Sequence, residues 1–317
     1  MERINFHGWK DSVRLANDGV ELVATTAVGP RIMHLAAPGR PNLLRVEESL
    51  KGKVGPADEW VNYGGHRLWH APEVFPRTYA PDNAPVAVSN AGDALVLSQD
   101  TEPSTGIQKT LAVKLADSGL PAVRVEHRLA NRNVWPVALA PWALTVVAPG
   151  GRVILPQPAY QAHGANNDYL PARPLVMWPF TEMADPRWTW GSRYIQLRAD
   201  AEIDRPQKLG VYSCDGWGAY QAPSGDLLII FVDPDPRGPA AFVDYGSNFE
   251  TFTKGDFQEL ETLGPLTTLE PDEEAVYVER WVVLSGDGLP ADDAGLAGAL
   301  APVIAQATDI VQRAFGK

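Results

Sequence analysis

Short apolar runs separated by turn residues fill most of the chain. From about residue 10 to residue 285, β-rich runs are interrupted by Gly, Pro, Asn and Asp every 8–12 residues or so, a spacing typical of a β-sandwich or barrel. In the run 123–129 apolar and polar residues alternate, which predicts a strand with one buried and one solvated face. Strands are predicted at 12–17, 20–26, 31–36, 86–90, 94–99, 107–116, 122–130, 137–147, 152–155, 193–198, 208–213, 227–232, 241–244, 248–253, 257–263 and 275–284.

The last segment departs from the strand pattern. An alanine-rich stretch follows Pro290, and its apolar residues recur with helical spacing. We expect a helix at about 292–315, with Asp292 or Asp293 as its N-cap, packed on the sheets. Gly and Pro are spread evenly, so no boundary is indicated and a single domain over 1–317 is predicted. The helical stripe consists of Leu296, Leu300, Val303, Ile304, Ile310, Val311 and Phe315.

Charge and composition narrow the class of partners. The chain has 27 Lys and Arg against 39 Asp and Glu, a net charge of −12, and no basic cluster, so a nucleic-acid partner is not expected. The N-terminus lacks the apolar run of a signal peptide, and no stretch approaches the roughly 20 apolar residues of a membrane span. We therefore expect a cytoplasmic protein without a membrane partner. Cys214 is the only cysteine, which excludes an internal disulfide, and its apolar surroundings predict a buried, inert thiol.

The segment 62–73, Asn-Tyr-Gly-Gly-His-Arg-Leu-Trp-His-Ala-Pro-Glu, is unusually dense in chemically active residues. Arg67 offers a planar fork of donors for sugar hydroxyls or a carboxylate, and Trp69 offers a flat apolar face to a pyranose. The alternative is a turn in which the arginine pairs with a carboxylate to hold a loop. His66 and His70 could share a metal on a helix, but the flanking Gly-Gly and Pro disfavour a helix, and a strand would separate the rings by about 13 Å. Neither a metal nor a cofactor is predicted.

A long segment at about 156–192 is rich in Pro, Asn, Asp and aromatic residues. Long loops in compact domains are often functional, and this aromatic content disfavours disorder. Trp188 and Trp190 alternate with polar groups as on sugar-binding surfaces, so the loop is predicted to form a pocket wall; the alternative is a lid that merely covers a sheet. Asn166, Asn167 and Asp168 are oxygen donors that would suit calcium as a passenger.

Glu259 and Glu261 lie two residues apart in a predicted strand, so both carboxylates should point to the same face. Like charges held close raise one of the two pKa values, which suits a general acid or base; a polar, solvated strand surface is the alternative. A glycosidase would need two carboxylates about 5–5.5 Å or 6.5–9.5 Å apart. The sequence lacks GxGxxG after a strand, GxxxxGK[ST], GxSxG and HExxH, so nucleotide-dependent, α/β-hydrolase and zincin chemistry have no support.

Taken together, these motifs resemble the aldose 1-epimerase (galactose mutarotase-like) superfamily, and more closely its DUF4380 branch. The likeness covers most of the chain, and the resemblance implies an all-β, two-sheet supersandwich with a C-terminal helix and a sugar cleft across one sheet. The residues that carry it are 21–23, 29–32, 64–69, 140–143, 210–213, 216–217 and 259–265.

The resemblance also implies roles for individual residues. In mutarotases a glutamate takes the proton of the anomeric hydroxyl while a histidine protonates the ring oxygen; Glu261, which precedes Thr262, matches that glutamate. Where the family has its histidine this chain has Pro141-Trp142, so another histidine would have to supply the acid. The catalytic candidates are Glu261, His66, His70 and His163. The substrate-binding candidates are Arg67, Trp69, Glu73, Trp142, Trp188, Trp190, Asp215, Trp217, Asp244 and Glu259.

Three functions fit this pattern. The leading hypothesis is a carbohydrate-active protein that interconverts sugar anomers, with a small-molecule carbohydrate as its ligand. The first alternative is a binding or sensor module for a sugar or sugar acid. The second alternative is a structural accessory sandwich.

Overall fold

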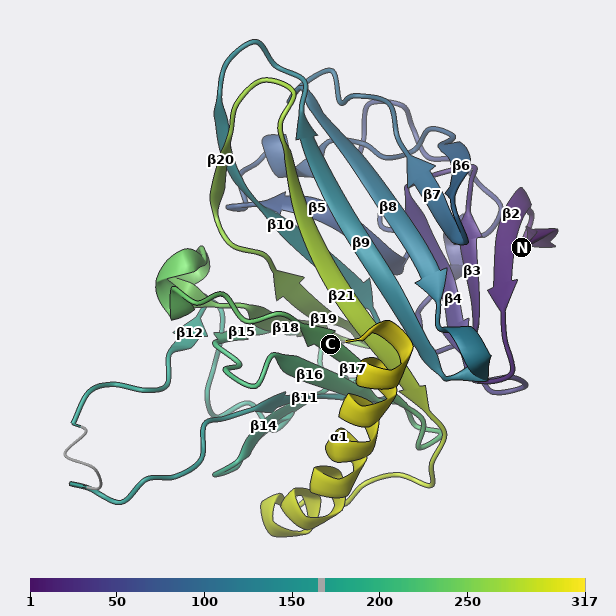
Figure 1. Cartoon of the computed structure of the whole chain (residues 1–317). Helices are drawn as coiled ribbons and strands as arrows, with labels where there is room; N and C mark the ends of the chain where they lie inside the picture. The colour runs from purple at the N-terminus through teal and green to yellow at the C-terminus, as the bar shows by residue number, and fades with distance from the viewer. Residues whose placement is uncertain (165–168, 317) are drawn as a thin grey trace.

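The computed structural model describes residues 1–164 and 169–316, and it consists mainly of two large antiparallel sheets with one long C-terminal helix (Figure 1). This architecture confirms the predicted all-β sandwich class. Short 3-10 turns lie at Glu48–Leu50, Arg77–Tyr79, Asp117–Gly119, Gly238–Ala241 and Asp244–Gly246.

The first sheet, called sheet 1 below, carries the candidate site. Its strands follow the spatial order β1-β2-β3-β4-β5-β10-β19-β18-β15-β12, and β20 pairs with the end of β10. The bounds are β1 Glu2–Phe6, β2 Trp9–Ala16, β3 Glu21–Thr25, β4 Arg31–Ala36, β5 Gly65–Ala71, β10 Val137–Val146, β12 Leu175–Met177, β15 Gln207–Val211, β18 Phe249–Lys254, β19 Phe257–Leu263 and β20 Thr267–Leu269.

The second sheet, sheet 2, packs against sheet 1. Its spatial order is β13-β14-β11-β16-β17-β21-β9-β8-β7-β6. The bounds are β6 Ala87–Ala91, β7 Ala94–Ser98, β8 Ile107–Leu115, β9 Ala122–Asn131, β11 Arg152–Pro156, β13 Trp188–Trp190, β14 Tyr194–Arg198, β16 Trp217–Gln221, β17 Leu227–Val232 and β21 Glu274–Leu284.

Most predicted strands coincide with observed ones, and the exceptions have local reasons. The prediction of a strand at 241–244 is wrong, because residues 238–241 and 244–246 form 3-10 turns in which Asp244 and Tyr245 have positive φ angles. The segment 65–71, which the sequence marked only as a turn followed by active residues, is the fully buried strand β5. The short strands β1, β12, β13 and β20, and β16, were not predicted.

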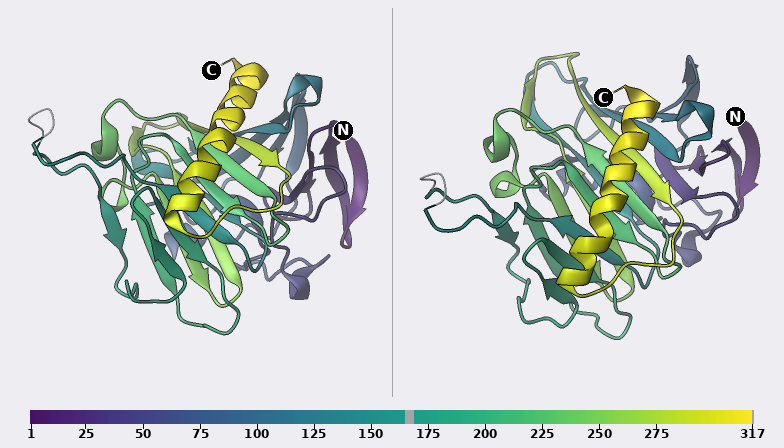
Figure 2. Two further views of the ribbon diagram at one scale, coloured as in Figure 1. Left: turned by 90° about the horizontal axis from the view of Figure 1, so that it is seen from below. Right: turned by 60° about the horizontal axis from the view of Figure 1, so that its bottom comes forward.

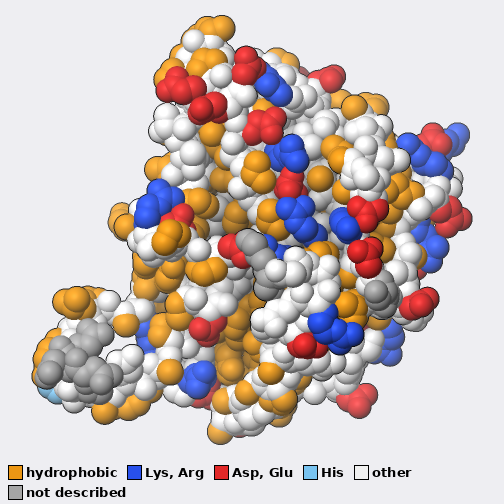
Figure 3. All heavy atoms as spheres, viewed as in Figure 1, with side chains coloured by type: hydrophobic (Ala, Val, Ile, Leu, Met, Phe, Trp, Pro, Cys, Tyr) orange, Lys and Arg blue, Asp and Glu red, His pale blue; other side chains and the backbone are white. Residues whose placement is uncertain are grey.

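Apolar side chains from the facing sides of both sheets form the main core. On β9, Val123, Val125 and Leu129 point into this core, whereas Arg124, Glu126 and Arg128 form ion pairs on the outer face. Acidic and basic side chains are accordingly interspersed over this outer side of the molecule (Figure 3). The alternation read from residues 123–129 therefore describes the real strand.

Helix α1, Asp293–Phe315, lies across the outer face of sheet 2 (Figure 2). Asp292 is its N-cap and accepts a hydrogen bond from the Gly295 amide, as predicted. Leu296, Leu300 and Ile310 are buried against sheet residues such as Ile229 and Val282. By length and composition alone the helix is long and apolar enough to cross a membrane, whereas the sequence pattern predicted no stretch of that kind. In the structure its apolar stripe is buried against sheet 2.

A polar cluster bridges the two sheets inside the core. Nε2 of His66 on β5 lies 2.7 Å from Nε2 of His127 on β9, and the fully buried Glu279 of β21 lies 3.9 Å from both. Nδ1 of His127 contacts the Tyr277 carbonyl oxygen, which can only accept, so Nε2 of a neutral His127 is free to accept from His66. The ligand atoms of the three side chains lie within 4.8 Å of one another, a spacing seen at metal sites, but a direct hydrogen bond joins the rings.

Burial displaces the protonation equilibria of this cluster in opposite directions. Burial lowers the pKa of His127 to about 4 and that of His66 well below its usual value, so both rings are held neutral. Burial raises the pKa of Glu279 to about 7, partly opposed by hydrogen bonds from Thr262 and Trp281. As the pH falls below about 6.5, the unfolded chain binds protons that the buried histidines refuse, so the free energy of unfolding decreases. Glu279 has the opposite effect: between about pH 7 and pH 4.5 it binds a proton in the folded protein first, which increases the free energy of unfolding.

Replacing Glu279 should therefore remove the effect that opposes the histidines, so that their effect on the pH dependence of stability can be measured. Glu279→Gln keeps an amide that can accept from the Trp281 indole and donate to the Thr262 hydroxyl, but it removes the proton uptake of the carboxylate on folding. We expect the free energy of unfolding of the variant to fall more steeply between pH 7 and pH 5 than that of the parent protein, by about 2 kcal/mol. Urea unfolding at both pH values measures the difference; parallel pH dependence in the two proteins would contradict it.

Candidate functional site

A cavity opens on the outer face of sheet 1, the face turned away from sheet 2. Strand alternation sends Arg67 and Trp69 of β5 to this face, together with Trp142 of β10 and Glu259 of β19. Leu144 pairs with Arg67 on one side and with Glu261 on the other, so the predicted arginine and glutamate lie in one row across three strands. Side chains from the early and late parts of the chain, Arg67 and Glu259, thus meet in one hollow, whereas Glu261 is buried in the same row of positions.

The first hollow of the cavity, with a volume of about 350 Å³, contains the ion pair of Arg67 and Glu259. Nη2 of Arg67 lies 3.0 Å from Oε1 of Glu259. The guanidinium also lies against two indole rings that contact each other, 5.3 Å from the ring centre of Trp60 and 4.7 Å from that of Trp69. Nε and Nη1 of Arg67 have no hydrogen-bond partner among the described residues, so these donors remain available for a ligand.

A buried lysine stands at the centre of the cavity. Nζ of Lys208 on β15 lies 2.9 Å from Oε2 of Glu250 and 2.9 Å from Oε2 of Glu261, which come from the two neighbouring strands. The ammonium also lies 4.7 Å from the ring centres of Trp142 and Trp178. Nε1 of Trp142 donates a hydrogen bond of 2.9 Å to Glu261. Glu261 is therefore covered by Lys208 and Trp142, and Lys208, not Glu261, lines the cavity.

Burial and mutual charge shift the pKa values of the acidic residues here. Burial raises the pKa of Glu250 to about 8, against the opposing effect of Lys208. Burial likewise raises the pKa of Glu259, with Arg67 opposing the shift. The pKa of Asp244 is also raised by burial. For Lys208, the two carboxylates outweigh burial and raise its pKa, so the ammonium stays protonated. The cavity thus combines a fixed cation with carboxyl groups that exchange protons closer to neutrality than usual.

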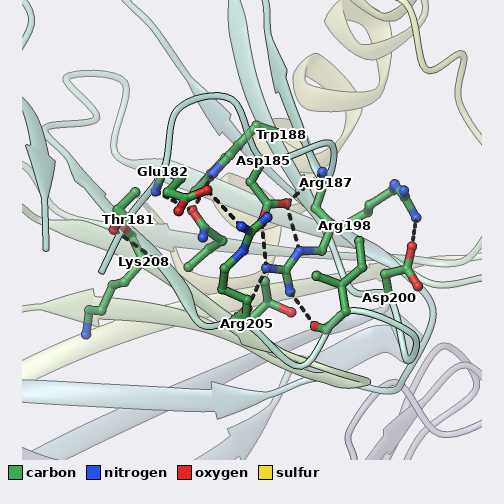
Figure 4. A network of polar contacts seen from close by, with 12 residues as sticks. Thr181, Glu182, Asp185, Arg187, Trp188, Arg198, Asp200, Arg205 and Lys208 are labelled. Carbon is green, nitrogen blue, oxygen red and sulfur yellow. Dashed lines mark hydrogen bonds and ion pairs between the residues drawn. The ribbon is translucent and has the colours of Figure 1, made fainter. Parts of the chain in front are cut away.

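The long loop predicted as a pocket wall does supply part of the wall, through Trp178 and Phe180. Figure 4 shows how the loop is anchored beside Lys208. Oγ1 of Thr181 donates a 2.5 Å hydrogen bond to the Lys208 carbonyl oxygen, and the Glu182 amide donates to the Gln207 side chain at 2.8 Å. Further along, Asp185 binds the guanidinium groups of Arg187 and Arg205. This network fixes Trp178 over the ammonium. The three residues predicted to suit calcium, Asn166, Asn167 and Asp168, lie outside the described residues.

A second hollow adjoins the first, with a volume of about 390 Å³. It contains Glu73, Phe75 and Asp244, and it shares Lys208 with the first hollow. Tyr79 donates a hydrogen bond to Oε1 of Glu73; burial and this carboxylate raise the pKa of Tyr79 to about 12. The predicted candidates Glu73 and Asp244 therefore belong to the cavity.

None of the three histidines predicted as possible acids lines the cavity. His66 and His70 lie on the inner face of β5, where His66 contacts His127 and Nε2 of His70 lies 3.7 Å from Glu102. Strand alternation is the reason, because Arg67 and Trp69 occupy the opposite face of the same strand. His163 is exposed and its ring contacts Tyr169 in the long loop.

Several other candidates also lie away from the cavity. Trp188 and Trp190 stack on each other in β13 at the edge of sheet 2, and Trp188 donates to Gln207. Trp217 is buried beneath helix α1, and Asp215 is exposed in the turn before it. In that turn Cys214 is exposed, so the prediction of a buried thiol is wrong; the chain leaves the sheet after residue 211, and Sγ reaches the surface beside Asp215.

Some of the residues that define the cavity gave no signal in the sequence. Lys208 and Glu250 stand in ordinary strand patterns, and only the pairing of β15 with β18, and of β18 with β19, brings them beside Glu261. Alternation within 207–211 and 249–254 could have predicted that each points to the polar face, but nothing local indicated that this face is buried. Trp60 comes from an irregular segment before β5 that carried no signal.

Comparison with known proteins supports the fold. No protein-family model and no curated protein sequence matches the chain. Among solved structures, a galactose mutarotase-like protein from Lactobacillus casei superposes with a TM-score of 0.56 at 10% identity, over 86% of this chain and 100% of that one. A galactose mutarotase-like protein from Clostridium acetobutylicum gives 0.51 at 11% identity, over 87% and 95% of the two chains.

A galactose mutarotase related enzyme from Lactobacillus acidophilus gives a TM-score of 0.50 at 8% identity, over 86% of this chain and 97% of that one. The chain therefore has the galactose mutarotase-like fold, which confirms the superfamily resemblance at the level of architecture. The closer likeness to the DUF4380 branch stays a prediction.

The buried lysine gives a direct test of the site's electrostatics. Lys208→Met leaves the carboxyl groups of Glu250 and Glu261 buried without their cation, which should lower the free energy of unfolding at pH 7 by about 3–5 kcal/mol. Loss of the cation removes the effect that opposes the raised pKa of Glu250, so the deficit should shrink as the pH falls and the carboxyl groups become neutral.

Denaturant unfolding of this variant at pH 5, 6 and 7 measures the effect. The matched control is Lys254→Met on the same sheet, whose side chain is 52% exposed and lies 3.7 Å from Asp204; it should change stability by less than about 0.5 kcal/mol. A deficit for Lys208→Met that does not depend on pH would show that lost packing, rather than unpaired charge, is its cause.

Proposed function

We propose that this protein binds a neutral sugar in the cavity over sheet 1 and interconverts its anomers. The observation that carries the proposal is the convergence of Arg67, Glu259 and Lys208, from distant parts of the sequence, on one hollow lined by indole rings. Indole faces stack on the C–H faces of a pyranose, and carboxylate and guanidinium groups hydrogen-bond its hydroxyls. The similarity to galactose mutarotase-like structures supports the same class of ligand.

In this proposal Glu259 is the base. It lines the hollow, and its raised pKa brings proton exchange closer to neutrality. Its carboxylate takes the proton of the anomeric hydroxyl as the bond between the anomeric carbon and the ring oxygen breaks, which leaves an aldehyde. Arg67 holds the carboxylate in place through Nη2 and offers its free Nη1 and Nε to a neighbouring hydroxyl.

Lys208 takes the part of the acid. Two contacts of its ammonium, to Glu250 and Glu261, tie it to the floor of the cavity. The ammonium can carry three N–H donors, so one remains for the ring oxygen. Its proton passes to that oxygen as the ring opens; a ring-oxygen alkoxide is basic enough to accept a proton even from an ammonium of raised pKa. After rotation about the bond from C1 to C2, the reverse transfers close the ring on the other face. Glu261 then acts as a positioning residue.

A second candidate is sugar binding without turnover. Two observations favour it: no histidine of the described part of the chain lines the cavity, and the raised pKa of Lys208 keeps its proton firmly bound. Measuring exchange and binding in the same samples separates the two candidates.

Saturation-transfer NMR between the α and β anomers of glucose, galactose, mannose and xylose tests the proposal. We expect exchange to be accelerated by the parent protein and lowered at least about 100-fold by Glu259→Gln, with affinity changed less than tenfold. Trp69→Ala should weaken binding itself, because it removes a stacking face. Trp135→Ala is the matched control, since this tryptophan is 60% exposed and lies outside the cavity lining, and it should change neither quantity.

The outcomes discriminate between the assignments. Exchange that survives Glu259→Gln but is lost in Glu261→Gln would transfer the role of base to Glu261. Binding without accelerated exchange in the parent protein would favour the non-catalytic candidate. The proposal would be overturned if the protein bound none of these monosaccharides and none of the disaccharides cellobiose, maltose and lactose.

A further inference from the structure

The cavity has two hollows that are joined side by side. They share the residues at their junction, which are Glu73, Tyr79, Trp142, Trp178 and Lys208. The first hollow has a volume of about 350 Å³ and the second of about 390 Å³, and both values fall near the lower end of the range for small-molecule sites. The space over sheet 1 is therefore a cleft of two adjoining hollows, with Lys208 at their junction.

Each hollow has its own set of recognition groups. The first has the Arg67 and Glu259 pair with the Trp60 and Trp69 rings. The second has the carboxyl group of Asp244 and the ring of Phe75, with Glu73 at the junction. Phe75 is 79% exposed, an unusual state for so large an apolar side chain, and its ring stands 5.8 Å from that of Tyr79 at the mouth. An aromatic face beside carboxyl groups is therefore repeated in both hollows.

We infer that the cleft binds a neutral reducing disaccharide, with the reducing unit in the first hollow and the second unit against Phe75. This inference rests on the proposed function and names the substrate class of the same site. The free anomeric carbon lies beside Glu259, and the linked unit stacks on Phe75 while its hydroxyls bond to Asp244 and Glu73. A monosaccharide fills the first hollow alone and leaves the second to water.

The charges of the cleft favour a neutral ligand over a phosphorylated or acidic one. Three carboxyl groups, from Glu73, Glu259 and Asp244, line the cleft beside two cations, Arg67 and Lys208, and both cations are already paired with glutamates. An anionic sugar would compete with those glutamates in a buried site, which is unfavourable. The sugar-acid ligand allowed by the sequence therefore does not suit this cleft.

Isothermal titration of the full chain with cellobiose, maltose and lactose, beside glucose, galactose and glucose 6-phosphate, tests the inference. We expect at least one disaccharide to bind tenfold or more tighter than either of its constituent monosaccharides, and the phosphate to bind more weakly than glucose. Phe75→Ala should weaken disaccharide binding several-fold and leave monosaccharide binding unchanged, because it touches only the second hollow. The side chain is exposed, so the variant should fold as the parent does.

Trp69→Ala is the matched variant of the first hollow and should weaken both kinds of ligand. Monosaccharides that bind as tightly as disaccharides, or an unchanged disaccharide affinity in Phe75→Ala, would overturn the inference while leaving the proposed function intact. Tighter binding of glucose 6-phosphate than of glucose would overturn the neutral class. If neither mono- nor disaccharides bind, the proposed function itself fails. Asp244→Asn provides a second check: like Phe75→Ala, it should weaken disaccharide binding and leave monosaccharide binding unchanged.

Discussion

The candidate site depends on one interaction, the ammonium of Lys208 held between the carboxylates of Glu250 and Glu261. Buried charges of one sign repel each other and lose their hydration, so two glutamates on adjacent strands would destabilise the fold without a cation between them. The lysine comes from the next strand, β15, and reaches both because β15, β18 and β19 pair in register. Its ammonium also lies against two indole rings, so the same contact fixes the aromatic walls of the cavity.

Strand alternation lets one strand serve both the core and the cavity. On β5, His66 and His70 point between the sheets, whereas Arg67 and Trp69 point into the cavity. The inner residues bind sheet 1 to sheet 2 through polar contacts such as that of His66 with His127. The outer residues stay in place because β5 is buried on both sides. The rigidity that a binding site needs is therefore supplied by the same contacts that join the sheets.

The long loop contributes through its anchoring rather than through all of its aromatic residues. Trp178 and Phe180 line the cavity, while Trp188 belongs to a strand of sheet 2 and contacts Gln207 at the base of the loop. Thr181 ties the loop to the backbone of Lys208 itself. Movement of the loop relative to the charged cluster would break this contact, so wall and cluster form one unit. The resemblance to mutarotases implied a histidine at the site. The structure has instead Lys208, paired with two glutamates.

The sequence by itself determined the class of fold, most of the strands, the capped C-terminal helix and the shared face of Glu259 and Glu261. These features depend on local periodicity and on turn and cap residues, which act over a few positions. It also marked Arg67, Trp69 and Glu73 as binding candidates, because their side chains have unusual chemistry in a dense setting, and the family resemblance added Trp142; all four line the cavity.

Only the tertiary structure decided which face of each strand is buried under a neighbour and which strands lie side by side. It therefore revealed Lys208 and Glu250, and it removed the histidines and the Trp188 and Trp190 pair from the cavity. The physical reason is that the sheet brings together residues as far apart in the sequence as Arg67 and Glu259, which are 192 positions apart and lie on the two strands that flank β10. The order of strands in a sheet leaves no trace in local patterns.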